Sequence, residues 1–373
     1  MKIALFFSYK NSAKSWHVSG ILNRELEIFR MLNKKYNFQY IFITYGFQDD
    51  IELIKDEFIE VVPLYKYFKK SKFDLINILN SFTYPIRIRS ILRKTDIIQQ
   101  NQINGVWVSI IAKLIVRKPL YVRTGYDLVL FHIENKKNFL KIALYKILTY
   151  ISLKLSKIYS VTSKQDYNHL IKNYNFENSK LKLHRNWVVP GTNKLSNKKG
   201  NILCVGRLES QKNYSKIIND FRNTKETVTI DIVGEGTLEA NLKSLAKKNN
   251  VNINFLGKLD NFQLKDLYYQ YKFFVTSSLF EGNPKSLLEA MGSGCVVLAS
   301  DIPNHRELID NGVNGILIEL SKGNFYKKYL EIMENNNLIH KISKNSIKKI
   351  EECNSIDVIS SLIYKDLISI NGK

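Results

Sequence analysis

The chain of 373 residues is poor in the residues that form cross-links and metal sites. Its three cysteines, Cys204, Cys295 and Cys353, have no paired spacing, which argues against a disulfide framework and a zinc site. Proline is scarce, with six residues, and no low-complexity stretch or short repeat stands out. These absences favour a globular protein of a reducing, cytoplasmic compartment.

Long apolar runs are also missing. No uncharged run approaches the roughly 18 residues that a transmembrane helix needs, and the apolar residues 3–7 are too few for a secretory signal. Residues 139–161 are rich in apolar positions, but lysines interrupt them. We expect an amphipathic helix there, buried on one side and able to touch a membrane.

Acidic residues are scarce in the first half of the chain. Residues 1–185 contain 31 Lys and Arg but only 14 Asp and Glu, a net charge of +17, which leaves +5 of the total of +22 for the rest. Residues 65–94 concentrate this excess and interleave it with Tyr and Phe. The mixture is typical of a peripheral contact with an anionic membrane. It also fits a solvated basic face over core aromatics, and a basic field by itself would attract nucleic acid.

The length predicts two domains, and a hydrophobic content of 45% supplies their cores. Short β-rich runs alternate with helical patterns in both halves, which predicts parallel sheets covered by helices. The periodicity breaks near an Asn/Lys/Ser-rich stretch. The predicted organisation is an N-terminal domain (1–185), a linker (186–200), a C-terminal domain (201–354) and a final amphipathic helix (355–373).

Residues 281–289, Glu-Gly-Asn-Pro-Lys-Ser-Leu-Leu-Glu, form the most informative segment. Asn283 as N-cap and Pro284 as the first helical residue predict a helix start between Glu281 and Glu289. Free N–H groups at such a start bind phosphate, and a carboxylate on each side accepts hydroxyls of a sugar nucleotide. Acids near a helix start are also common for purely structural reasons.

Three further loops follow predicted strands of the second half. Arg207 and Lys212 follow the first strand and together could neutralise a diphosphate without a metal. Gly234 opens a Gly-Glu-Gly loop that lacks the third glycine of the dinucleotide fingerprint, so it is weak evidence for NAD. Leu259 follows the third strand and would flank a nucleotide base. Ligands of parallel sheets bind at such strand ends.

With these residues in order, the second half resembles a retaining glycosyltransferase of family 4, in the GT-B class. The resemblance implies an α/β fold of two Rossmann-like parallel-sheet domains that face a central cleft. It also implies that the final helix packs back on the N-terminal domain. The matching segments are 205–213, 234–236, 255–257, 277–284, 289–294, 300–303 and 307–309.

The resemblance also implies roles for individual residues. Arg207 and Lys212 would bind the donor diphosphate and stabilise the departing nucleoside diphosphate. Glu289 would accept hydrogen bonds from the ribose, and Glu281 would contact the transferred sugar near the reacting face. The other implied donor-binding residues are Gly20, Gly234, Leu259, Gly282, Asn283, Pro284 and Lys285.

The sequence departs from the family pattern at three places. Gly-Asn-Pro at 282–284 stands where many relatives have Gly-Phe-Gly, and the single Gly20 stands where they have a glycine pair. The histidine that many relatives carry after the strand at 119–124 is missing. Its role would fall to Asp127 or Tyr126, unless both are structural groups, and Asp127 is our candidate for the catalytic set.

The expected function is transfer of a sugar from a UDP-, GDP- or ADP-sugar to a saccharide or lipid-linked acceptor, in cell-surface polysaccharide or lipopolysaccharide biosynthesis. We expect no metal and no cofactor, because Arg207 and Lys212 supply the charge. The expected location is the cytoplasm, at the cytoplasmic face of the membrane. An inactive sugar-nucleotide-binding protein and a GT-B-type epimerase are the alternatives. A nucleic-acid-binding protein would leave residues 281–289 unexplained.

Overall fold

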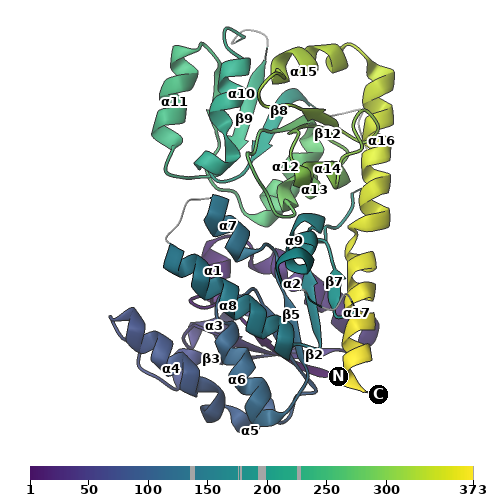
Figure 1. The fold of residues 1–373 in the computed structure, drawn as a ribbon. Coiled ribbons are helices and arrows are strands. Elements are labelled where there is room, and N and C mark those ends of the chain that lie inside the picture. The colour runs from purple at the N-terminus through teal and green to yellow at the C-terminus, as the bar shows by residue number, and fades with distance from the viewer. Residues whose placement is uncertain (135–138, 175, 177–178, 192–198, 225–227, 373) are drawn as a thin grey trace. The chain divides into compact units, whose positions relative to one another are not determined.

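The chain folds into two α/β units. The computed structural model describes all residues except 135–138, 175, 177–178, 192–198, 225–227 and 373. The first unit consists of Met1–Arg185 with Ser360–Lys373, and the second of Asn186–Ile359. Each unit contains one parallel sheet with helices around it (Figure 1). The predicted fold class is confirmed; that the two sheets face one central cleft stays a prediction.

The first unit is built on a seven-stranded sheet with the order β3-β2-β1-β4-β5-β6-β7. Every neighbouring pair is parallel, beginning with Lys2 beside Gln39 and Ile3 beside Ile97. The strands are β1 (Lys2–Phe6), β2 (Gln39–Thr44), β3 (Ile59–Pro63), β4 (Ile97–Asn101), β5 (Leu120–Arg123), β6 (Ile158–Val161) and β7 (Leu181–Leu183).

Helices cover both faces of this sheet, because right-handed crossovers leave the central β1 in both directions. The helices in the connections from β1 to β3 lie on one face of the sheet, and the helices in the connections from β3 to β7 lie on the other. The helices are α1 (Ala13–Val18), α2 (Leu22–Tyr36), α3 (Asp49–Leu53), η1 (Leu64–Lys66), α4 (Asp74–Arg87), α5 (Arg89–Leu92), α6 (Val106–Val116), α7 (Leu128–Glu134), α8 (Phe139–Leu155), α9 (Lys164–Tyr174) and α17 (Ile356–Asn371).

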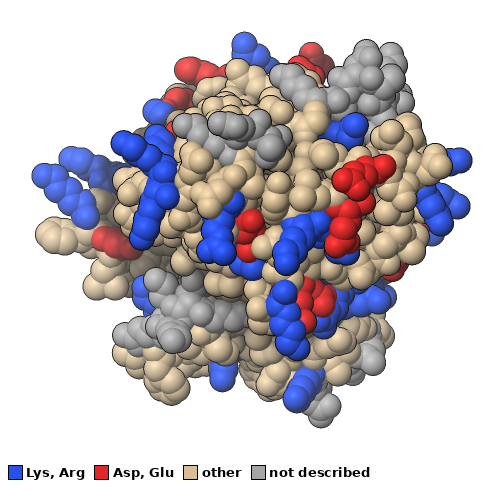
Figure 2. All heavy atoms as spheres, turned by 90° about the horizontal axis from the view of Figure 1, so that it is seen from above, with Lys and Arg blue, Asp and Glu red and all other residues tan. Residues whose placement is uncertain are grey.

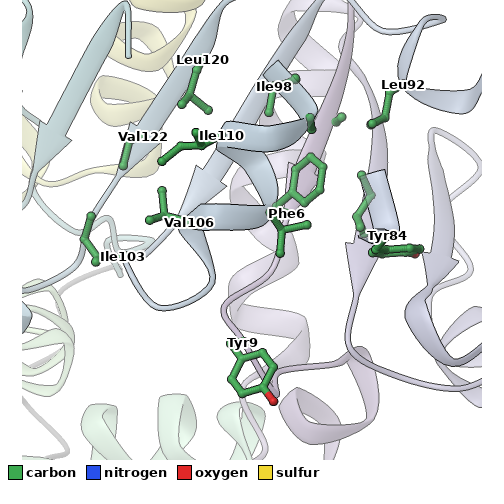
Figure 3. Packing of buried hydrophobic residues seen from close by; sticks show 14 of the residues in the cluster. Phe6, Tyr9, Tyr84, Leu92, Ile98, Ile103, Val106, Ile110, Leu120 and Val122 are labelled. Atoms are coloured by element: carbon green, nitrogen blue, oxygen red, sulfur yellow. The ribbon is translucent and has the colours of Figure 1, made fainter. Parts of the chain in front are cut away.

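The core of the first unit lies between the sheet and its helices. Strands buried on both faces read as continuous apolar runs, as the sequence of β1 does. Val106 and Ile110 of α6 lie over strand side chains such as Val122, and Phe6 packs in the same cluster (Figure 3). Truncating a fully buried aromatic such as Phe6 to alanine would cost about 3–5 kcal/mol.

The last helix completes the first unit from the far end of the chain. Tyr364 of α17 stacks on Tyr36 of α2, with ring centroids 3.9 Å apart. The Tyr36 and Ser361 hydroxyls lie 3.1 Å apart, within hydrogen-bond distance. The described residues therefore join the C-terminal helix to residues more than 300 positions earlier in the sequence.

The second unit is built on a six-stranded parallel sheet with the order β10-β9-β8-β11-β12-β13. The strands are β8 (Lys199–Val205), β9 (Thr229–Val233), β10 (Asn252–Phe255), β11 (Tyr271–Thr276), β12 (Val296–Ser300) and β13 (Ile316–Ile318). The helices are η3 (Ser210–Lys212), α10 (Tyr214–Asp220), α11 (Glu239–Lys248), α12 (Asn261–Gln270), α13 (Lys285–Gly292), α14 (Pro303–Arg306), α15 (Phe325–Met333) and α16 (Asn336–Cys353).

The segment predicted as a linker, 186–200, contributes structure to the second unit. Val188 accepts a backbone hydrogen bond from Ile356 at 3.0 Å and donates one to Asn354 at 2.9 Å. Lys199 already begins β8. Residues 192–198 lie outside the described part of the chain.

Surface charge is mixed on the face in Figure 2, where blue Lys and Arg side chains stand out and red carboxylates lie among them. Within the described residues, no helix is long and apolar enough to cross a membrane.

Candidate functional site

The candidate donor site lies at the C-terminal edge of the second sheet. Six parallel strands end at this edge, and the five that concern the site are β8 to β12, with β8 between β9 and β11. Each of these five strands is followed by one of the loops or helix starts that the sequence singled out. A parallel sheet binds its ligands at this edge.

Backbone hydrogen bonds join these loops to one another. The N–H of Gly206 donates to the Val233 carbonyl at 2.9 Å, and the N–H of Gly234 donates to the Gly257 carbonyl at 2.8 Å. The N–H of Leu279 donates to the carbonyl of Gln211 at 2.9 Å. The loops after β8, β9, β10 and β11 therefore form one connected rim.

Gly234 is required by this close approach. Its φ is +140°, and a Cβ atom there would lie 2.1 Å from the carbonyl oxygen of Gly206. Any side chain at this position would push the β8 and β9 loops apart. The glycine predicted from the Gly-Glu-Gly pattern thus has a packing role, whatever ligand the rim binds.

Lys212 and Glu281 form a buried ion pair inside this rim. Nζ of Lys212 donates to Oε1 of Glu281 at 2.6 Å, and their side chains are only 14% and 9% exposed. The Ser278 hydroxyl donates to the same oxygen at 2.7 Å. The sequence assigned Lys212 to the donor diphosphate; the structure shows its ammonium bonded to a carboxylate.

The electrostatics of Glu281 follow from its neighbours. Burial by itself would raise the pKa of this carboxyl, but the charge of Lys212 and the hydrogen bonds from Lys212 and Ser278 lower it below its ordinary value. Glu281 is therefore ionised at neutral pH and can accept, but not donate, a hydrogen bond.

A buried histidine stands behind this carboxylate, and the sequence analysis missed it. Nδ1 of His305 lies 2.7 Å from the Ser300 carbonyl oxygen, and the Ser300 hydroxyl donates to the Ser278 carbonyl at 2.6 Å. Burial lowers the pKa of His305, so the imidazole is neutral at pH 7. Nε2 of His305 has no hydrogen-bond partner among the described residues. Ser300 is only five residues earlier in the chain, whereas Ser278 and Glu281 follow another strand, so the local sequence does not indicate that His305 belongs to the site.

Arg207 and Leu259 lie on the same rim with different exposure. Arg207 is exposed, and its guanidinium reaches Oε1 of Gln211 at 3.5 Å. Leu259 is partly buried against the apolar cluster beneath the edge. Arg207 is therefore a rim cation that solvent and an anionic ligand can reach.

The start of α13 differs from the prediction by one residue. Pro284, not Asn283, occupies the N-cap position, because its carbonyl accepts the first helical bond from Leu288 at 3.2 Å. Asn283 is buried, and its Oδ1 accepts the N–H of Asn186 at 2.8 Å. The predicted N-cap was wrong because Asn283 satisfies a distant backbone group, which the local pattern cannot show.

The remaining predicted residues of this segment flank the helix start. Gly282 is half-buried in the loop before α13. Lys285 begins the helix, with Nζ 4.4 Å from the centroid of the Trp187 ring. Glu289 is half-buried one helical turn later, on the same face as Lys285.

Two predicted residues, Gly20 and Asp127, belong to the first unit. Gly20 follows α1 with φ +73°. Oδ1 of Asp127 accepts the N–H groups of Val129 at 2.7 Å and Leu130 at 3.0 Å, so this carboxylate caps α7. Burial raises the pKa of Asp127. The structural role left open for Asp127 is present; a catalytic role stays a prediction.

The first unit has a pocket of its own at the C-terminal ends of β1, β4 and β5, with a volume of about 530 Å³. Its wall combines cationic, amide and aromatic groups, a mixture typical of small-molecule sites. Tyr126 lines it, and so does His132, which the sequence analysis did not place. Other lining residues are Phe7, Trp16, Arg24, Glu25, Asn101, Gln102 and Arg123.

The three polar residues at the end of β4 differ in whether they reach this pocket. Asn101 lines the pocket, but Gln99 and Gln100 are buried. Nε2 of Gln100 donates to the carbonyl of Gln102 at 3.0 Å, so this amide is used inside the fold. Within the described residues, no group of three His, Cys, Asp or Glu side chains could hold a metal ion.

Comparison with known proteins finds glycosyltransferases among the similar chains. Residues 189–349 match the family described as "Glycosyl transferases group 1". An N-acetylgalactosamine-N,N'-diacetylbacillosaminyl-diphospho-undecaprenol 4-alpha-N-acetylgalactosaminyltransferase of Campylobacter jejuni is 32% identical over 150 residues, 39% of this chain and 40% of that protein. The GtfA subunit of a UDP-N-acetylglucosamine–peptide N-acetylglucosaminyltransferase of Streptococcus agalactiae is 31% identical over 121 residues, 31% of this chain and 24% of that protein. The chain thus spans less than half the length of these relatives.

Similarity to solved structures extends over the whole chain. Anabaena Alr3699/HepE in complex with UDP-glucose has a TM-score of 0.74 and 16% identity, and the match covers 99% of this chain and 100% of that one. At this identity the likeness concerns the fold alone. Together with the two parallel sheets it identifies the GT-B fold.

Proposed function

The second unit carries a glycosyl transferases group 1 segment on a GT-B chain, and from this premise we propose that the protein is a glycosyltransferase. It would transfer a sugar from a nucleotide-diphosphate sugar with retention of configuration, as members of family 4 do. The observation that carries the proposal is the rim itself: an exposed arginine, a buried Lys–Glu pair and the start of α13 share one sheet edge.

The proposed donor is a UDP-sugar, in preference to a GDP- or ADP-sugar. Supporting this choice, the solved relative holds UDP-glucose and the GtfA relatives are named for UDP-N-acetylglucosamine. Arg207 would pair with the diphosphate, since a guanidinium binds two phosphate oxygens at once. Glu289 would accept the ribose hydroxyls, and Gly234 and Leu259 would border the nucleotide.

The chemistry requires stabilisation of charge on the departing diphosphate. Preorganised cations and a helix N-terminus lower that barrier without moving during the reaction. Arg207 and the first N–H groups of α13 would serve this role. Lys212 would act through Glu281, keeping that carboxylate ionised so that it accepts a hydroxyl of the transferred sugar. No cofactor and no metal enter this scheme.

The proposed acceptor is a saccharide or a lipid-linked saccharide, in cell-surface polysaccharide or lipopolysaccharide biosynthesis. The pocket of the first unit, with its aromatic and amide wall, would bind it. The Campylobacter relative is named for a diphospho-undecaprenol acceptor, which supports the lipid-linked choice. A peripheral position at the cytoplasmic face of an anionic membrane belongs to the same proposal.

The test is a thermal-shift series with UDP-, GDP- and ADP-sugars. A donor at about 100 times its dissociation constant should add about 2.7 kcal/mol of stability. The shift should appear with a UDP-sugar and disappear in Arg207→Ala and Glu289→Ala. Arg222→Ala, an exposed arginine after α10, is the matched control that should keep the shift. A shift that survives both rim variants, or no shift with any donor, would refute the proposed site.

Transfer itself is tested separately. Release of the nucleoside diphosphate should need an acceptor, and NMR of the product should show the anomeric configuration of the donor. Conversion of the nucleotide sugar without acceptor would instead identify an epimerase, and binding without turnover would identify a sugar-nucleotide-binding protein.

A further inference from the structure

Two helices of the first unit are apolar on the side that faces away from the core. They are α4 and α8, which lie in the same helical layer, because the crossovers from β3 to β4 and from β5 to β6 run in the same direction. Helix α6 lies between them and packs against both. Figure 1 shows α4, α6 and α8 as neighbours.

On α4 the exposed side chains are large and apolar. Leu75, Leu79, Phe82 and Ile86 recur at spacings of four, three and four residues, so they form one stripe along the helix. Leu75 is 68% and Leu79 58% exposed. The buried side of the same helix carries the polar residues Asn77 and Ser81, which have hydrogen-bond partners inside the unit.

Helix α8 also has large apolar side chains on its exposed side and polar residues on its buried side, and its exposed residues recur with the same spacing. Leu140, Leu144, Ile147 and Ile151 form its exposed stripe. Its buried residues include Thr149 and Ser152, and the Ser152 hydroxyl donates to the Leu148 carbonyl at 2.6 Å. Single apolar residues on a surface need no explanation. Two stripes, each of four large exposed apolar side chains, indicate an interaction surface.

Basic residues surround the two stripes. Asp74 is the single acid at 65–94, and it is paired with Lys10 at 2.9 Å. A cavity of about 320 Å³ where α4 begins is lined by Lys10, Lys70 and Lys72. The exposed bases near the stripes are Lys69, Lys70, Lys72, Arg87, Arg89, Arg93, Lys94, Lys141, Lys146 and Lys154.

We propose that the exposed faces of α4 and α8 dock on an anionic lipid bilayer, with their Leu, Ile and Phe side chains among the upper acyl chains and the surrounding Lys and Arg at the phosphates. Charge complementarity selects this occupant, since the apolar stripes need a hydrocarbon phase and the cations need anionic headgroups. Nucleic acid would use the bases but leave the stripes in water. The inference deepens the membrane position that is part of the proposed function and names the surface that makes the contact, but it does not depend on sugar transfer.

The test measures cosedimentation of the full chain with vesicles. Wild type should bind equimolar phosphatidylcholine–phosphatidylglycerol vesicles, and salt should reduce this binding. It should bind pure phosphatidylcholine vesicles more weakly by a factor of about ten or greater. The variant Leu75→Gln/Leu79→Gln/Leu144→Gln/Ile147→Gln should lose binding about tenfold or more. Phe262→Gln, which changes an apolar residue of α12 that is 64% exposed, is the matched control and should bind normally.

The outcomes separate this inference from the proposed function. Glu289→Ala should lose the nucleotide shift and keep vesicle binding, whereas the four-site variant should keep the nucleotide shift, which also shows that it folds. Equal vesicle binding by the four-site variant and wild type would overturn the inference. A wild-type dimer in light scattering that the four-site variant converts to a monomer would also overturn it, because a second copy would then cover the stripes.

Discussion

Removing the cation of the Lys212–Glu281 pair should cost far more stability than removing one from an exposed pair of the same length. The Lys212 and Glu281 side chains are 14% and 9% exposed, with a distance of 2.6 Å between Nζ and Oε1. Lys243 and Glu239 on α11 have the same 2.6 Å distance, but their side chains are 54% and 34% exposed. Burial, not distance, is what distinguishes the two pairs.

Lys212→Met would leave the charge of Glu281 buried without its partner, at a cost of about 3–5 kcal/mol. Lys243→Met should cost less than about 1 kcal/mol, because water screens the exposed pair. For a unit of this size about 1 kcal/mol corresponds to about 2–4 °C, so Lys212→Met should lower the second unit's Tm by about 6–20 °C in calorimetry. Lys212→Met/Glu281→Gln should recover much of this loss, since no buried charge remains.

The loss should also depend on pH in a direction set by Glu281. The pKa of this carboxyl is below its ordinary value of 4.5 in the folded chain. Such a group contributes stability that is present above its unfolded pKa and is lost as pH falls through the folded pKa. Without Lys212, burial would raise the pKa, so the difference between wild type and Lys212→Met should shrink as the solution is acidified towards pH ~4. Equal losses of stability in Lys212→Met and Lys243→Met would refute this reasoning. So would a stability difference between wild type and Lys212→Met that does not change with pH.

Three further variants test other parts of the structure. Gly234→Ala should lower stability by about 1–3 kcal/mol and abolish the nucleotide shift, because a Cβ would meet the Gly206 carbonyl oxygen; an unchanged Tm would contradict the close approach. Tyr364→Ala should cost about 1–3 kcal/mol in the first unit's unfolding transition through loss of the stack on Tyr36, whereas Tyr364→Phe should be nearly neutral. Asn283→Ala should cost about 1–3 kcal/mol in denaturant unfolding, because it leaves a backbone N–H without its acceptor; a neutral result would mean that water replaces the side chain.

The second unit was largely predictable from sequence. Its strands are short apolar runs separated by helical patterns, and a parallel α/β sheet follows from that alternation. Because every strand of such a sheet points the same way, the loops after successive strands meet at one edge. Sequence reasoning could therefore bring Arg207, Gly234 and Glu281 to the same rim without knowing the strand order.

The first unit was harder, because composition does not tell which way a side chain points. The sequence left two interpretations of residues 65–94 open, a membrane contact and a basic face over core aromatics, and the aromatic residues there support both. Tyr84 is buried and Tyr65 packs against the core, as a basic face over core aromatics requires. Phe73 and Phe82 are exposed, as a membrane contact requires. The exposed apolar stripes of α4 and α8 could be recognised only from the burial of each side chain in the structure.

The sequence by itself determined the fold class and the loops of the donor rim, because both depend on periodicity and on residues close together along the chain. Tertiary structure alone decided the partners of buried polar groups: Lys212 with Glu281, Asn283 with Asn186, and Ser300 with Ser278. A buried polar group must find a partner somewhere, and the nearest one in space comes from another strand or loop. Local sequence therefore predicts where such a residue lies along the chain, while the packing of distant segments decides what it does.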